Sequence, residues 1–364
     1  MLTTVVVLLI INVAVFIHEL AHYLNARSVG LSVRAFSIGM GPILLRKRWR
    51  GTEWRLSLLP LGGYVDLPGL AGEPGEDGKM TTPEHGFAKL NLWQKLWVLV
   101  GGVTANFVLA ILLVATVIVL EPATRALTAG ITVPTAAVFA DVIADTKAQE
   151  VGVQAGDVVR EMNGQANPDA DEVRTMLQSD GPLILTLERQ DGTLVTVETV
   201  WAPELEPDGS RPLFGVSLGT VVLEPPPAIS FGAATLEAAG FLLRAVPQSL
   251  SGFVSAIGQT FTGQRSDDIA GPVRIVGAVG QAAQVGLAPV LFLAGIINFS
   301  LAIFNLLPIP GLDGGRMLLS TIIAIRGRPF KPGQEELIHF LGFAAIFAFI
   351  ILVTFGEVSD LLTR

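Results

Sequence analysis

Long apolar runs dominate the hydrophobic pattern of this chain, and four of them are long enough to cross a lipid bilayer. They lie in residues 1–24, 96–120, 288–311 and 336–358. A bilayer-spanning helix needs about 20 consecutive apolar residues. The chain is 51% hydrophobic and only 15% charged, whereas soluble domains carry about 25% charged residues. We therefore predict a polytopic α-helical membrane protein with about four transmembrane helices.

Positively charged residues indicate how these helices are oriented. Residues 25–95 carry ten Lys or Arg, and the short segment 312–335 carries four. Because Lys and Arg concentrate in cytoplasmic loops, we place both segments in the cytosol. Both termini and the acidic residues 121–287 then lie on the outer side, so the predicted topology is N-out and C-out.

The segment after the second predicted span has the pattern of a small β-rich domain. Residues 124–220 contain short β-rich runs separated by turn signals. The runs 182–189 and 193–200 flank a Gln-Asp-Gly turn, which predicts a β-hairpin. The sequence VGVQAGDVVREMNGQ, residues 151–165, resembles the core of a PDZ domain, with a generic small β domain as the alternative. The predicted topology makes this inserted domain extracytoplasmic.

Residues 231–287 have a different character. They are apolar, rich in small residues and interrupted by Gly and Pro. We predict membrane-associated amphipathic helices that lie on the membrane or pack against the spans. A further full span would place the basic residues of the later loop outside, so we do not expect one.

The sequence HELAH places His18, Glu19 and His22 at the end of the first predicted span. Residues four apart on a helix lie about 40° apart around its axis, so both imidazole rings can reach one metal ion. In zinc peptidases with this spacing, the glutamate between the histidines acts as general base. The motif supplies two ligands, whereas a catalytic zinc site needs three protein ligands and an open position.

The third ligand must come from elsewhere, and the chain has no cysteine to supply it. His85 lies in a polar loop sequence, where a solvated histidine is the simpler interpretation. His339 begins the fourth span, where interfacial histidines are common. Asp313 in NLLPIPGLDGGRM is the better candidate, because it is expected on the same membrane side as the motif histidines and carboxylates near apolar segments are usually functional. A turn or helix-cap aspartate is the alternative.

HELAH in a first span and NLLPIPGLDGGR in a late span together resemble the site-2 protease family of intramembrane zinc metalloproteases. With one PDZ-like domain, the chain is most similar to the bacterial RseP/RIP branch, and the resemblance extends over nearly all of it. It implies that His18, His22 and Asp313 bind Zn²⁺ and that Glu19 is the catalytic base. It also implies hydrolysis of peptide bonds in or near the transmembrane segment of single-pass membrane proteins.

The resemblance also implies a re-entrant β-hairpin in the first cytosolic region. Residues 36–69 look like this element of the family, with its G-x-G motif at Gly39 and Gly41. Two strand-like runs joined by a polar turn fit that interpretation. A strand edge could hold an unwound substrate by β-augmentation. An ordinary cytosolic hairpin is the alternative.

Three residues of the third span are candidates for binding substrate. Asn305 lies eight residues before Asp313, and the resemblance implies that it positions the substrate. Many relatives have a second asparagine five residues earlier, where this chain has Ser300. Asn298 or Ser300 is expected to take that role. A helix–helix hydrogen bond is the simpler role for such polar groups in an apolar span.

The resemblance places the protein in the bacterial inner membrane, with its active site near the cytosolic face. The expected partners are the lipid bilayer and single-pass transmembrane substrates, of the anti-sigma factor or remnant signal peptide type, in regulated intramembrane proteolysis; no nucleic acid partner is expected. The PDZ-like domain is expected to filter substrates by size or to bind exposed C-termini. The alternatives are a catalytically inactive PDZ membrane scaffold and a metal transporter. An intact Glu19 between the two histidines favours the protease.

Overall fold

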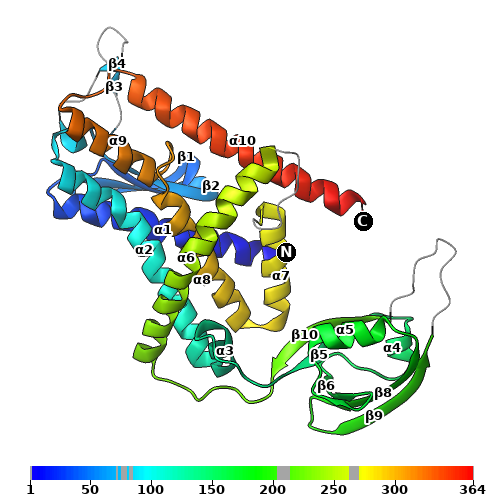
Figure 1. The fold of residues 1–364 in the computed structure, drawn as a ribbon. Helices are drawn as coiled ribbons and strands as arrows, with labels where there is room; N and C mark the ends of the chain where they lie inside the picture. Colours follow the sequence, from blue (N-terminus) through cyan, green and yellow to red (C-terminus); the bar gives the residue numbers. More distant parts are fainter. Residues whose placement is uncertain are drawn as a thin grey trace. The chain divides into compact units, whose positions relative to one another are not determined.

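The computed structural model describes residues 2–70, 73–74, 80–81, 85–202, 214–261 and 270–363. The predicted regions 25–95, 124–220 and 231–287 therefore each include a stretch that lies outside the described residues. The chain divides into two compact units (Figure 1). The helical unit comprises Met1–Leu120 and Ser230–Arg364, and the β unit comprises Glu121–Ile229.

Four helices in the described part of the chain are long and apolar enough to cross a membrane. They are α1 (Leu2–Ser28), α2 (Leu92–Leu120), α8 (Leu287–Leu306) and α10 (Gln334–Thr363). The four predicted apolar helices are therefore confirmed. Their ends differ from the predicted ones by a few residues, because polar side chains continue a helix beyond its apolar run.

Two further helices follow the β unit in the helical unit. They are α6 (Phe231–Phe261) and α7 (Pro272–Val285). Leu242 of α6 is fully buried among side chains of α2 and α8, which include Ala110 and Phe299. Of the two arrangements predicted for this region, α6 thus shows packing against the apolar helices.

The segment 312–335, which we predicted as a loop, contains the helix α9 (Asp313–Arg326). Its charged residues hid a helical pattern that buries Leu319 and Ser320. Gly327 ends the helix in the left-handed conformation, with φ of 66°, and its N–H bonds the carbonyl of Ile323. The polar composition of this segment correctly indicated a connection between two apolar helices, but it gave no sign that most of the connection is helical.

Small residues allow α2 to approach its neighbours closely in the helical unit. A Cβ atom on Gly101 would lie 2.7 Å from Nδ2 of Asn25 in α1. A Cβ atom on Gly295 of α8 would lie 2.9 Å from a methyl group of Val114 in α2. Membrane helices associate through such close contacts, because lipid provides no hydrophobic driving force between them. Both contacts place α2 directly between α1 and α8.

The predicted hairpin is present as β1 (Ala35–Trp49) and β2 (Thr52–Asp66), which pair in antiparallel fashion. Residues 35–38 have partners in two parts of β2, at 53–56 and at 63–66. Both strands must therefore bend. Gly39, Gly41 and Gly62 have φ of 80°, 84° and 80° at these bends, a conformation that side chains disfavour.

The two ends of the hairpin differ in their surroundings. At its base, the buried ring of Phe36 packs against Phe16 and Tyr23 of α1 and against Trp54 of β2. This aromatic cluster attaches the hairpin to α1. The far end is exposed and apolar, with Ile43, Leu44, Leu45, Trp49, Leu58 and Leu59 each at least 43% accessible. Short elements β3 (Glu73–Pro74), β4 (Met80–Thr81) and η1 (Gly86–Lys89) follow it.

The β unit contains a six-stranded sheet. Its strand order is β10-β5-β6-β8-β9, with β7 paired to β6. The strands are β5 (Thr135–Val142), β6 (Val158–Met162), β7 (Gln165–Ala166), β8 (Gly181–Glu188), β9 (Leu194–Trp201) and β10 (Val216–Val222). The pairing of β8 with β9 confirms the predicted hairpin.

Short helices accompany the sheet of the β unit. They are η2 (Pro122–Thr124), α3 (Arg125–Thr128), α4 (Lys147–Glu150) and α5 (Ala170–Leu177). Asp169 and Glu172 form a capping box at the start of α5. Val173 of α5 packs with Leu185 and Leu187 of β8 in the core of the unit. The apolar alternation along β8 thus decides which face of the sheet receives the helix.

Replacing Leu185 by Ala is expected to destabilise the β unit. The side chain is 0% exposed, and a Leu-to-Ala change in a core costs about 2–5 kcal/mol. Amide hydrogen exchange of β8 in the full-length protein should become faster by the corresponding factor. Leu194→Ala on the paired strand is the control, because Leu194 is 63% exposed. Equal exchange in the two variants would contradict the assigned core.

Candidate metal centre

Two histidines of α1 meet one aspartate of α9 in the helical unit. Nε2 of His18 lies 3.1 Å from Nε2 of His22. Oδ2 of Asp313 lies 3.1 Å from Nε2 of His18 and 3.2 Å from Nε2 of His22. The three side chains are mostly buried, with 9–15% of each exposed. Residues 291 positions apart in the sequence thus form one compact cluster.

The donor set and its spacing suit a zinc ion. Two imidazole nitrogens and a carboxylate oxygen are common zinc ligands, with bond lengths of about 2.0–2.2 Å, so tetrahedral geometry puts neighbouring ligands about 3.3 Å apart. The three atoms here are separated by nearly that distance. Among the described residues, this cluster is the one group of three such side chains that could hold a metal.

A backbone carbonyl of α2 orients one of the two histidines. Nδ1 of His22 lies 2.9 Å from the carbonyl oxygen of Val98. A carbonyl oxygen can only accept, so Nδ1 donates its proton and leaves Nε2 free to bind a metal. The side chain that faces the corresponding nitrogen of His18 is Asn106, whose Nδ2 lies 3.4 Å from Nδ1.

Gly102 of α2 packs directly against both imidazole rings. A Cβ atom at this position would lie 2.5 Å from Cε1 of His18 and 2.5 Å from Nε2 of His22. Any side chain there would displace the rings, so the site needs glycine for space. We did not predict roles for Gly102 or Asn106. Their signal in the sequence is a glycine followed by an asparagine four residues later within an apolar span, where polar residues are uncommon.

Glu19 of α1 lies against β2, the second strand of the hairpin. A backbone hydrogen bond from Val65 reaches its carboxylate. A Cβ atom on Gly63 would lie 3.6 Å from Cγ of Glu19. The structure therefore brings the hairpin to this glutamate through Gly63 and Val65 of β2. The predicted substrate-binding residues Gly39 and Gly41 form the bend of β1.

The loop before Asp313 folds back tightly onto the start of α9. Helix α8 ends at Leu306, and Leu312 is the N-cap residue of α9. Asp313 is therefore not the cap that we considered as its alternative role. Side chains on Gly314 or Gly315 would overlap carbonyl oxygens of this loop. The glycine pair is thus a packing requirement of the loop that presents the aspartate.

Helix α10 supports the same loop from its other side. The N–H of Gly311 donates to Nδ1 of His339 over 2.9 Å. A Cβ atom on Gly342 would overlap the carbonyl oxygen of Pro310. His339 therefore holds the loop and is not in the metal cluster. His85 is also outside the cluster and precedes the short helix η1.

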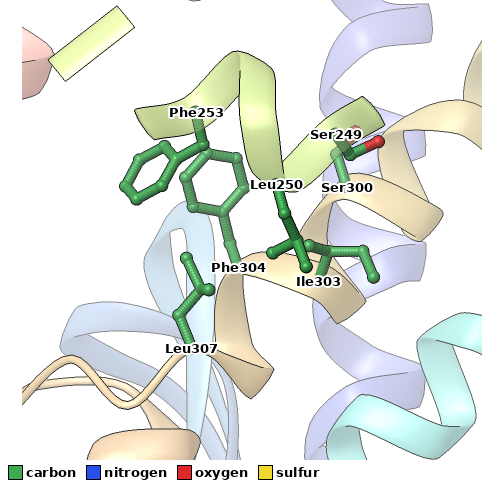
Figure 2. A pocket seen from close by; sticks show the side chains of 7 residues that line it. All are labelled: Ser249, Leu250, Phe253, Ser300, Ile303, Phe304 and Leu307. Atoms are coloured by element: carbon green, nitrogen blue, oxygen red, sulfur yellow. The ribbon is translucent and has the colours of Figure 1, made fainter. Parts of the chain in front are cut away.

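The predicted substrate-binding residues of α8 lie in different surroundings. Asn298 is buried, its Nδ2 donates to the carbonyl of Ala294, and its Oδ1 has no partner among the described residues. Asn305 is half-buried in the last turn of α8. Ser300 lines an apolar cleft between α6 and α8 (Figure 2). Its other lining residues are Ser249, Leu250, Phe253, Ile303, Phe304 and Leu307.

Comparison with known proteins agrees with this geometry. The profile described as Peptidase family M50 matches residues 6–349. A protein of Agrobacterium fabrum whose name describes a zinc metalloprotease is 30% identical over 98% of this chain and 95% of its own length. A Nostoc protein with such a name is 28% identical over 98% and 95%. The zinc metalloprotease RasP of Shouchella clausii is 42% identical over 29% of this chain and 25% of its own length.

Replacing Gly102 by Ala is expected to disrupt the cluster. The added methyl group must push against both rings, so zinc bound per purified chain should fall at least tenfold, the lower end of losses seen when ligand orientation is disturbed. Metal analysis after dialysis against a limiting zinc buffer measures this. Gly277→Ala in α7 is the control, because a Cβ there meets nothing within 4 Å. Full zinc content in Gly102→Ala would contradict the close contact.

Proposed function

The chain belongs to peptidase family M50, and we propose that it hydrolyses peptide bonds within or beside the transmembrane segments of single-pass membrane proteins. Family and relatives make it a membrane metalloprotease with zinc as its cofactor. One observation carries the proposal that cleavage takes place in the membrane. Two of the three residues of the metal cluster, His18 and His22, lie on an apolar helix long enough to span a bilayer.

His18, His22 and Asp313 are the residues that would hold the zinc ion. When bound, zinc polarises a carbonyl group and activates a water molecule for attack. Glu19, next to the first histidine in sequence, takes the proton of the attacking water and passes it to the leaving amine. The Glu19 carboxylate also lies beside the backbone of Val65 in β2.

A transmembrane substrate must unwind before it can be cleaved, because a helix engages its own peptide groups in hydrogen bonds. We propose that the hairpin holds the unwound form. Residues 63–66 pair with 35–38 on one side and have no other strand partner among the described residues. This edge also contacts Glu19 through Gly63 and Val65. An extended substrate that pairs with the edge by β-augmentation would therefore lie beside the base.

Gly39 and Gly41 take part in this proposal indirectly. Their positive φ angles bend β1, so that its first residues can pair with residues 63–66 while the rest of the strand leaves this edge. A Cβ atom on Gly39 would lie 2.6 Å from the carbonyl oxygen of Leu59. The two glycines thus shape the substrate edge and need not contact the substrate themselves.

Asn305 is proposed to position the substrate near the cluster. It lies in the last turn of α8, immediately before the loop that carries Asp313, and its amide can donate to an oxygen of the scissile region. Of the two candidates for a supporting role, Ser300 is favoured. It faces the cleft between α6 and α8 (Figure 2), whereas Asn298 is buried.

We propose a PDZ-like role for the β unit. Its strand β10 is an edge of the sheet, and a helix of the unit, α5, ends a few residues before the β8–β9 hairpin. The unit would screen substrates by the size of their outer domains, or bind their exposed C-termini.

The proposed location is the bacterial inner membrane, with the β unit outside and the metal centre near the cytosolic face, as the basic loops favour. Anti-sigma factors and remnant signal peptides are the proposed substrate types.

An inactive scaffold and a metal transporter are the competing functions. A scaffold that binds partners through the β unit has no use for a carboxylate held beside three metal ligands. A transporter needs the ligands but not Glu19, and it predicts zinc flux in sealed vesicles. The position of Glu19 between the metal cluster and a strand edge favours hydrolysis of an extended peptide over both.

Glu19→Gln is expected to abolish proteolysis while zinc remains bound. The amide cannot accept the proton, and loss of a general base lowers rates about 10²–10⁴-fold. Cleavage of a single-pass reporter substrate in proteoliposomes measures the rate, and metal analysis measures the zinc. Asp313→Ala is the matched variant that should lose both. Wild-type cleavage by Glu19→Gln would rule out the proposed function.

The Glu19→Gln variant should also retain its natural substrates. With chemistry blocked and the binding edge intact, cross-linking in the native membrane followed by mass spectrometry should recover peptides that contain a membrane-spanning segment. Asp313→Ala tests whether capture needs the metal centre. Recovery of soluble proteins alone would contradict the substrate class.

A further inference from the structure

A buried amide on α2 faces the metal centre without satisfying its own hydrogen bonds. Asn106 is 1% exposed and lies in the apolar helix α2. Its Nδ2 is 3.4 Å from Nδ1 of His18, and its Oδ1 has no hydrogen-bond partner in the described structure. A buried amide oxygen without a donor is unusual, since most such groups are paired.

The chemistry of zinc binding decides which amide atom should face the ring. His18 presents Nε2 to the cluster, so its metal-binding form carries the remaining proton on Nδ1. That N–H needs an acceptor, and an amide NH₂ group offers none. With Nδ2 toward the ring, two donors would face each other while the amide oxygen remains unpaired.

Rotation of the amide by 180° removes the clash of two donors at His18. The oxygen and nitrogen of an asparagine side chain have nearly the same shape, and their positions are assigned from the hydrogen bonds they make. After rotation, Oδ1 accepts the proton of His18 Nδ1, and the NH₂ group takes the place where the described residues offer the oxygen no donor. The distance of 3.4 Å is at the long end for a hydrogen bond and closes with a small movement of either side chain.

We propose that Asn106 is the positioning residue of His18: its Oδ1 accepts the Nδ1 proton and so fixes the tautomer and orientation in which Nε2 binds zinc. This inference rests on the metal centre of the proposed function and extends it to α2. Oxygen acceptors that orient metal-bound histidines in this way strengthen metal binding.

Both histidines are then oriented by one face of a single helix. Val98, Gly102 and Asn106 are spaced four residues apart in α2, so they lie on one side of it. The carbonyl of Val98 pairs with His22, Gly102 packs against both rings, and Asn106 pairs with His18. An amide suits this place in an apolar helix, because a neutral acceptor avoids burying a further carboxylate beside Asp313 and Glu19.

The test compares three variants of the full-length protein in detergent micelles. Asn106→Leu removes the acceptor at similar volume, and Asn106→Asp keeps an oxygen in its place. Asn298→Leu is the matched control, because Asn298 is a similarly buried asparagine of an apolar helix whose Oδ1 has no partner, and whose amide bonds no histidine, among the residues that the structure describes. Zinc affinity is measured by competition with a chromogenic chelator, and ligand geometry by the visible absorption of bound Co²⁺.

Asn106→Leu is expected to weaken zinc binding 10- to 100-fold, the usual effect of losing such a partner, and to alter the Co²⁺ spectrum. Asn106→Asp should bind zinc within a few-fold of wild type, and Asn298→Leu should match wild type in both measurements. Wild-type zinc affinity in Asn106→Leu would overturn the inference. So would equal weakening in the Asp and Leu variants, because it would show that packing and not the acceptor matters.

A measurement on the wild-type protein keeps the inference testable if Asn106→Leu does not fold. In the zinc-loaded protein, ¹⁵N NMR of labelled histidine should show a protonated Nδ1 on His18, and an unprotonated Nδ1 would overturn the inference. Failure of the proposed function has a different signature, since zinc would then bind the wild type and His18→Ala equally well. A wild type that needs His18 for zinc but is insensitive to position 106 refutes the role of Asn106 alone.

Discussion

The contact between α1 and α2 at Gly102 is the constraint on which the metal centre depends. Because this residue has no side chain, the backbone of α2 lies against the imidazole rings of His18 and His22. The same approach puts the carbonyl of Val98 within hydrogen-bonding distance of His22. A membrane helix pair associates through close packing and not through the exclusion of water. The packing that holds the two helices together therefore also orients the ligands.

Asp313 completes the centre through a separate set of backbone contacts. Its loop folds over Gly314 and Gly315, and α10 supports the loop through His339 and Gly342. The hairpin reaches the centre from another direction, with Gly63 and Val65 beside Glu19. Three separate elements thus converge on one end of α1. The carboxylate of Asp313 is placed beside two ring nitrogens, which reduces the penalty for a charge near apolar helices.

Much of this arrangement was predictable from local patterns. Four apolar runs predicted four helices, the alternation in residues 182–200 predicted a hairpin, and HELAH identified half of the metal centre. Helical periodicity alone places His18 and His22 on one face. The helix α9 was missed, because its polar start outweighed a pattern that buries only one side. The sequence indicated the hairpin and its glycines Gly39 and Gly41 but gave no sign that β2 contacts Glu19.

The sequence by itself determined the class of chemistry, since two histidines four residues apart around a glutamate favour a metal and a base wherever the helix lies. The sequence favoured Asp313 over His85 and His339 as the third ligand, and the tertiary structure places its carboxylate beside both histidines. Tertiary structure alone decided the partners of the ring nitrogens and the strand that meets Glu19. Periodicity describes neighbours within about two turns of one helix. These contacts join residues separated by 44 to 291 positions and depend on how closely separate helices and strands can pack.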